Sequence, residues 1–153
     1  MTHTDWTVRT EAALTWVLRS CAATGGQGSA HSWSPLFGWA KAYPETTGYL
    51  IETLLNYSNA EHGVQNAELR TSIHTAAFKS AEWLVTLQLP SGAFPGLLAG
   101  HQHPSVFNTA QILFGLAAVL RADDCPPTLR QSALTATQRA VDWLLNILEP
   151  DGA

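Results

Sequence analysis

A repeated tryptophan motif constrains the fold of this chain more than any other feature. In each copy the tryptophan lies near the end of an amphipathic segment. The copies are Leu14-Thr15-Trp16-Val17-Leu18, Glu82-Trp83-Leu84-Val85 and Asp142-Trp143-Leu144-Leu145. The tryptophans recur at intervals of 67 and 60 residues, and in the last two copies a glycine follows nine residues later. Periods of this length indicate repeated helical units.

The segments between the motifs also match one another. Residues 45–51 (Glu-Thr-Thr-Gly-Tyr-Leu-Ile) align with residues 107–113 (Phe-Asn-Thr-Ala-Gln-Ile-Leu) at an offset of 62. Each unit therefore holds an amphipathic outer helix, a turn and a more apolar inner helix, a pattern typical of α/α toroids. We expect one all-α domain over residues 1–153. It would be an incomplete α/α toroid of about two and a half helical hairpins, part of a longer ring. An ordinary five-helix bundle is the alternative.

Hydrophobic periodicity predicts five helices. Their ranges are 5–22, 44–58, 69–89, 105–121 and 127–148. Pro44 suits a first helical position, and Ser105 suits an N-cap. Residues 30–42 carry no helical or strand pattern but are rich in aromatic side chains. We expect this stretch to fold onto the protein or to line a site.

Composition excludes several classes of protein. Charged residues make up 13% of the chain, about half the usual share. The net charge of −4 and the scattered basic residues argue against a nucleic-acid partner. No apolar run is long enough for a membrane span, and the start has no signal-peptide pattern. Cys21 and Cys125 form no metal or redox motif, so we expect a cytoplasmic protein with reduced thiols.

Two segments suggest a family. Trp-Leu-x-x-x-Gln-x-x-x-Gly-Ala-Phe (residues 83–94) and Pro-Ser-Val-Phe-Asn-Thr-Ala-Gln-Ile-Leu-Phe-Gly-Leu (residues 104–116) resemble repeats of bacterial α/α-toroid proteins. These proteins are described as prenyltransferase/squalene-cyclase-like or grouped with six-hairpin glycosidases. Residues 38–49 are similar to a subgroup associated with polysaccharide gene clusters. The acidic motif of terpene cyclases and the zinc ligands of prenyltransferases and lanthionine-type cyclases are missing, so the resemblance implies carbohydrate handling.

A polar stripe on the second predicted helix supplies the candidate catalytic groups. Glu45, Tyr49, Glu52 and Asn56 fall on one line at about 100° per residue and face either solvent or a wet cavity. Glu45 is a candidate general acid/base, or else a carboxylate that complements the helix dipole. Glu52 lies about 10 Å further along the axis. Because paired glycosidase carboxylates lie roughly 5–9.5 Å apart, these two must lean together to cooperate. Otherwise Glu52 is bonded to a neighbouring helix.

The candidate substrate-binding residues are aromatic or polar and lie on the loops and inner helices. They are Trp39, Tyr43, Tyr49, Asn108, Gln111, His101 and His103. The amides either bond to neighbouring helices or face ligand. We expect no metal, because His101 and His103 have no third ligand nearby, and no cofactor. Trp16, Trp83 and Trp143 are interpreted as packing residues, and His62 and His74 as surface residues.

Two functions of different classes remain open. The first is an enzyme, or part of one, that binds an oligosaccharide or polysaccharide at the end where the inner helices begin. It would use acid/base chemistry of the hydrolase, lyase or epimerase type. The second is a non-catalytic toroid fragment for binding or assembly, and terpenoid or prenyl chemistry is a distant third. An incomplete ring would expose apolar surface, so we expect self-association or coverage by further chain.

Overall fold

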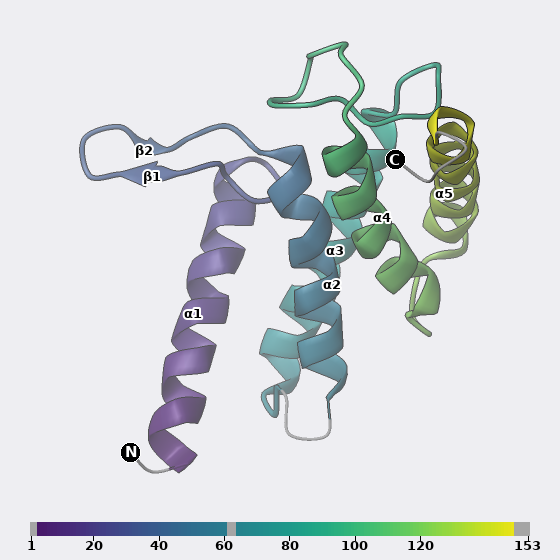
Figure 1. The fold of residues 1–153 in the computed structure, drawn as a ribbon. Coiled ribbons are helices and arrows are strands. Elements are labelled where there is room, and N and C mark those ends of the chain that lie inside the picture. Colours follow the sequence, from purple (N-terminus) through teal and green to yellow (C-terminus); the bar gives the residue numbers. More distant parts are fainter. Residues whose placement is uncertain (1–2, 61–63, 149–153) are drawn as a thin grey trace.

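The computed structural model describes the backbone of residues 3–60 and 64–148 and the side chains of residues 6–60 and 64–148. Five helices and one small sheet form within these residues (Figure 1): α1 (His3–Ala23), β1 (Trp33–Ser34), β2 (Gly38–Trp39), α2 (Pro44–Asn59), α3 (Ala67–Thr86), α4 (Val106–Arg121) and α5 (Pro127–Ile147). The predicted all-α class is confirmed. α3 ends at Thr86 rather than Leu89, because the next N–H groups bond carbonyls three residues back, in a tighter turn.

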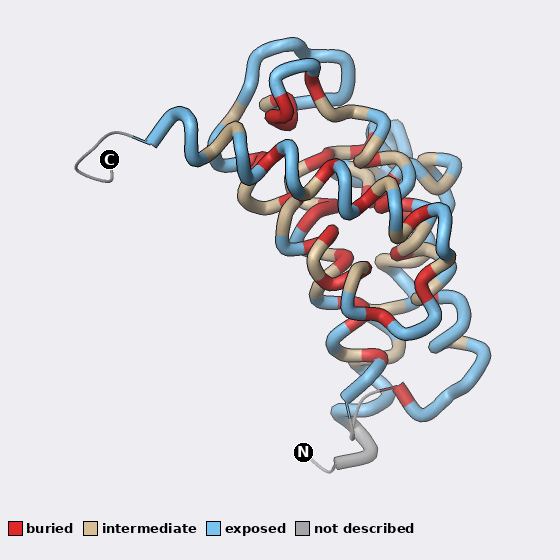
Figure 2. Tube along the Cα trace, turned by 90° about the vertical axis from the view of Figure 1, so that its right-hand side faces the viewer, coloured by how far each residue is buried: buried red, intermediate tan, exposed pale blue. Residues whose placement is uncertain are grey.

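The helices lie in two layers. α2 and α4 pack together as one layer, and α1, α3 and α5 form the other, with α3 behind α2 in Figure 1. The main core lies between the layers, and its largest fully buried members are Ile51, Leu55, Leu84, Phe94, Ile112, Leu116 and Leu129. Figure 2 shows these buried stretches as a band through the body. The two-layer order agrees with predicted inner and outer helices, while closure into a ring remains a prediction.

Hydrogen bonds at the start of each inner helix repeat: the helix residues lie at the predicted offset of 62, and their loop partners, Ser29 and Phe94, at an offset of 65. Thr47 Oγ1 accepts the N–H of Ser29 at 3.0 Å, and Thr109 Oγ1 accepts the N–H of Phe94 at 2.9 Å. Four residues before each threonine, a second bond reaches the same loop residue: Tyr43 N–H donates to Ser29 O, and Ser105 N–H donates to Phe94 O. The α1–α2 and α3–α4 hairpins are therefore structural repeats. Residues 150–153, the third glycine turn, lie outside the described residues.

α2 and α4 cross at two glycines. A Cβ atom on Gly48 would lie 2.6 Å from Gln111 O, and one on Gly115 would overlap Gly48 O. Neither position admits a side chain without moving backbone. The inner helices therefore approach each other as closely as their main chains allow, and this sets the spacing of the loops above them.

The starts of the inner helices are fixed as predicted. Pro44 occupies the first turn of α2, and Ser105 Oγ caps α4 by accepting the N–H of Asn108 at 3.2 Å. The stretch expected to be irregular instead forms a hairpin, in which Trp33 pairs with Trp39 and Ser34 with Gly38. Its turn closes because Gly38 adopts a φ of 70°, which side chains with a Cβ rarely allow.

The long loops of both hairpins lie at one end of the molecule, at the top of Figure 1. None of the helices in the described part of the chain is both long and apolar enough to cross a membrane.

Candidate functional site

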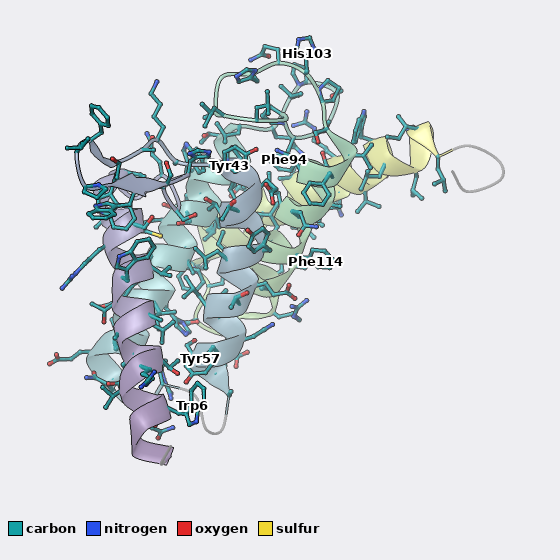
Figure 3. All side chains as sticks on the ribbon, turned by 60° about the vertical axis from the view of Figure 1, so that its left-hand side comes forward. Trp6, Tyr43, Tyr57, Phe94, His103 and Phe114 are labelled. Atoms are coloured by element: carbon teal, nitrogen blue, oxygen red, sulfur yellow. The ribbon has the colours of Figure 1, made fainter. Side chains whose placement is uncertain are left out.

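A cavity of about 430 Å³ lies between the β1–β2 hairpin and the loop before α4. Its lining comes from three segments: the β1–β2 hairpin, the start of α2 and the loop before α4, called the second loop below. The lining residues are His31, Ala40, Lys41, Tyr43, Leu97, Leu98 and His101. In Figure 3, Tyr43 lies at the top of α2, and the loop carrying His103 rises beside it. Two structural repeats thus contribute to one site.

A second cavity, of about 550 Å³, adjoins the first and shares Ala40, Lys41 and Leu98 with it. Its other lining residues are Ala23, Thr24, Gln27, Trp39, Ala42, Trp83 and Ala99. Two tryptophans and the polar residues Gln27 and Thr24 therefore line this space. Each volume falls in the range of roughly 300–1,000 Å³ that small-molecule sites occupy. Together the cavities can hold an extended ligand.

Three predicted binding residues meet at these cavities. Tyr43 and His101 line the first, and Trp39 lines the second. Trp39 is partly engaged within the protein, because its ring centroid lies 4.6 Å from that of Trp16 and 6.5 Å from that of Trp33. The indole cluster fixes the hairpin against α1 and leaves Trp39 half-buried.

Asn108 positions the second loop. Its Nδ2 donates to Pro95 O at 3.1 Å, and its Oδ1 accepts from Ser105 Oγ at 3.2 Å. The buried amide is satisfied by its own protein, so its role is to hold the loop rather than to face the cavities. Gln111 is half-buried on α4 beside Gly48, and His103 is exposed, with its carbonyl accepting the N–H of Gly96.

The polar stripe of α2 faces outward. Tyr49 is 40% exposed, and Asn56 is also exposed. Glu45 is half-buried in the first turn of α2, and a carboxylate of Glu52 lies 3.8 Å from Arg121 of α4. Neither glutamate lines the two cavities. The structure therefore gathers three of the seven binding candidates, Trp39, Tyr43 and His101, without bringing Glu45 and Glu52 to them.

Most of the lining residues were missed by the sequence predictions, among them His31, Lys41, Trp83 and Leu97. His31 and Lys41 are opposite each other across the hairpin, where His31 N–H donates to Lys41 O at 2.8 Å. A hairpin pattern around Pro35 and Gly38 was the signal that could have found them. Trp83 packs against the core as predicted and also lines a cavity.

His74 is not the surface residue that was expected. Its Nε2 lies 2.8 Å from Ser58 Oγ, and its Nδ1 lies 2.6 Å from an oxygen of Asp124. The hydrogen-bonded connection of a serine to a histidine and of that histidine to an aspartate matches the connection in nucleophilic triads. However, Ser58 is fully buried and its hydroxyl also bonds Leu55 O at 3.0 Å. The group therefore ties α2, α3 and the α4–α5 connection together rather than attacking a substrate.

Neither cysteine is a reactive thiol in this fold. Cys21 and Cys125 are free and buried. Burial raises the pKa of the Cys21 thiol, against a smaller lowering by a hydrogen bond with Ser80. Burial also raises the pKa of Cys125, which Arg130 lowers and Asp124 raises further. Because the thiolate is the nucleophile, a raised pKa leaves both side chains inert at neutral pH.

Comparison with protein-family models gave no match, and neither did comparison with curated proteins or with solved structures. Evidence for the site's function therefore comes from its own geometry.

Proposed function

We propose that this chain binds an oligosaccharide or polysaccharide across the two cavities between its loops. The observation that carries the proposal is their adjacency: a wall of Ala40, Lys41 and Leu98 is common to both. Indole rings on one side and a phenol and imidazoles on the other suit sugars, which present apolar C–H faces and hydroxyl groups. This assignment agrees with the expected α/α-toroid family, a carbohydrate-handling role in polysaccharide metabolism and a cytoplasmic location.

Binding is favoured over catalysis by the positions of the carboxylates, since both predicted acid/base groups lie outside the cavity linings. Glu45 keeps the enzymatic alternative open, because it lies two residues after Tyr43 in the first turn of α2. A hydrolase, lyase or epimerase would need it to reach the bound sugar. The non-catalytic alternative needs only the lining residues.

A thermal-shift screen tests the proposal. Acidic and neutral oligosaccharides are compared with prenyl diphosphates on wild type and on Trp83→Leu, with Trp143→Leu as the matched control at the equivalent repeat position. A ligand at tenfold excess over its Kd adds roughly 1.4 kcal/mol of stability. We expect an oligosaccharide to stabilise wild type and Trp143→Leu but not Trp83→Leu. Stabilisation by prenyl diphosphates alone, or by nothing, would contradict carbohydrate binding.

Glu45→Gln separates the two functional classes. If the protein only binds the saccharide, the variant keeps the wild-type Kd, and neither protein changes the ligand on long incubation. Product formed by wild type and abolished in Glu45→Gln, at unchanged Kd, would make the protein an enzyme with Glu45 as its proton-handling group.

A further inference from the structure

The cavity between the loops has no acidic side chain in its lining. Of its seven lining residues, Lys41, His31 and His101 offer nitrogen donors and Tyr43 offers a hydroxyl, while the rest are apolar. The whole chain carries twelve acidic and eight basic residues. The lining holds a lysine, two histidines and no carboxylate, so its charge is opposite in sign to the net negative charge of the chain.

The side chain of Lys41, unlike its main chain, makes no contact recorded among the described residues that would stabilise the fold. Several arginines are committed to structural contacts: Arg70 bonds Val64 O, Arg139 bonds Leu89 O and Pro90 O, and Arg121 lies near Glu52. Among the described residues, by contrast, the ammonium group of Lys41 has no recorded ion pair or hydrogen bond. Its charge is therefore available to a ligand.

The backbone places Lys41 and His31 side by side in the lining of the cavity. The two residues are directly opposed across the hairpin, so their side chains emerge on the same side. The ring of His31 lies 5.5 Å from that of Tyr43, and its Nδ1 lies 3.1 Å from Ser32 Oγ. These contacts orient the His31 ring beside Tyr43 on the hairpin side of the cavity.

The facing wall is strained. Leu97 has a φ of 62°, the one positive value at a residue other than glycine in the described part of the chain. Such a conformation is sparsely populated and persists where the surroundings enforce it, which is common at ligand sites. The exposed Leu97 lines the same cavity as Lys41.

We propose that this cavity selects saccharides that carry an anionic group, a carboxylate or a sulfate. Lys41 supplies the opposing charge, His31, His101 and Tyr43 supply hydrogen bonds, and the adjoining cavity with Trp39 and Trp83 takes a neighbouring sugar ring. This inference rests on the proposed saccharide binding and adds the chemical class of the ligand.

Calorimetric titration with matched probes tests the inference. The acidic probes are tetramers of galacturonate, mannuronate and glucuronate-containing repeats, together with a sulfated galactose tetramer. The uncharged counterparts are the fully methyl-esterified uronates and unsulfated galactotetraose. They keep the sugar skeleton and remove the charge, by a methyl group on each carboxylate in one case and by loss of the sulfate group in the other. The variants are Lys41→Gln and, as a control, Lys79→Gln, which replaces the chain's other lysine on the outer helix α3.

We expect at least one acidic probe to bind wild type and Lys79→Gln about tenfold more tightly than its uncharged counterpart. Lys41→Gln removes that difference. Equal binding of charged and uncharged probes would overturn the anionic selectivity while leaving saccharide binding intact. A preference that survives Lys41→Gln would overturn the role of Lys41 and the inference with it. Absence of binding by every probe would overturn saccharide binding itself.

Discussion

His74 shows how a hydrogen-bond inventory fixes a residue's role. A hydroxyl has one proton, and Ser58 uses its proton on Leu55 O. His74 Nε2 lies 2.8 Å from Ser58 Oγ, and Nδ1 lies 2.6 Å from an oxygen of Asp124. Both ring nitrogens therefore have a partner at hydrogen-bond distance. His74 therefore clamps three segments at the end of the molecule opposite the loops.

Asp124→Asn removes the charge that faces His74. We expect a loss of about 1 kcal/mol in the free energy of unfolding, a modest value because the Asp124 side chain is 56% exposed. Urea unfolding followed by circular dichroism measures it. Asp123→Asn is the control, since the neighbouring carboxylate makes no recorded contact with the described residues and should cost less than about 0.5 kcal/mol. Equal losses in both variants would show that general charge, and not the clamp, is responsible.

At the scale of the elements, the glycine crossing of α2 and α4 explains why the inner helices carry so little side-chain bulk there. Gly48 and Gly115 each face backbone of the partner helix. Helix propensity alone favours alanine at both positions by about 1 kcal/mol. The close approach outweighs that preference.

Gly115→Ala should destabilise the protein by about 1–3 kcal/mol, because its Cβ would overlap Gly48 O and main chain cannot move aside cheaply. The midpoint of urea unfolding reports the change. Gly96→Ala serves as the control, since the nearest atom to its Cβ, Ser105 Cβ, lies 3.4 Å away. A Gly115→Ala variant as stable as wild type would mean that the two helices are further apart than the structure shows.

Periodicity predicted the five helices because each one buries an apolar face, which places an apolar residue at every third or fourth position. The loops have no such pattern. His31 and Lys41 meet through main-chain hydrogen bonds, and Leu97 reaches the cavity through a strained backbone. Those features depend on how the hairpins stack. Tyr43, Trp39 and His101 were found because aromatic and imidazole groups in a loop are uncommon without a role.

At the scale of the whole molecule, α4 and α5 expose an apolar edge. Its members are Val106, Phe107, Phe114, Leu134, Val141, Leu145, Ile147 and Leu148, each at least 40% exposed. Figure 3 shows Phe114 on α4, well below the loops, and Figure 2 shows the end of α5 projecting from the body. Phe107, Ala110 and Phe114 correspond at the repeat offset to Glu45, Gly48 and Glu52 of α2. Because the glycine of that set contacts α4, we expect the corresponding face of α4 to pack against another helix.

We expect the chain alone to self-associate through this edge, since large exposed apolar patches mark sites of association. Light scattering over a range of concentrations should show a rising mean mass for wild type and a lower one for Phe114→Gln. Phe37→Gln, which removes a more exposed phenylalanine from the hairpin (88% against 50% for Phe114), is the control and should behave as wild type. A monomeric wild type at high concentration would contradict the expected association.

The most direct test of a shared site between the two loops uses the six tryptophans, whose indole N–H groups give separate signals in a ¹H–¹⁵N spectrum. Tetragalacturonate is titrated into the labelled protein. We expect the Trp39 and Trp83 indole signals to move together with the backbone amides of His31, Lys41 and His101, while the Trp6 and Trp143 indoles stay in place. Shifts confined to α1 or α5, or no shift at saturating ligand, would contradict a saccharide site between the loops.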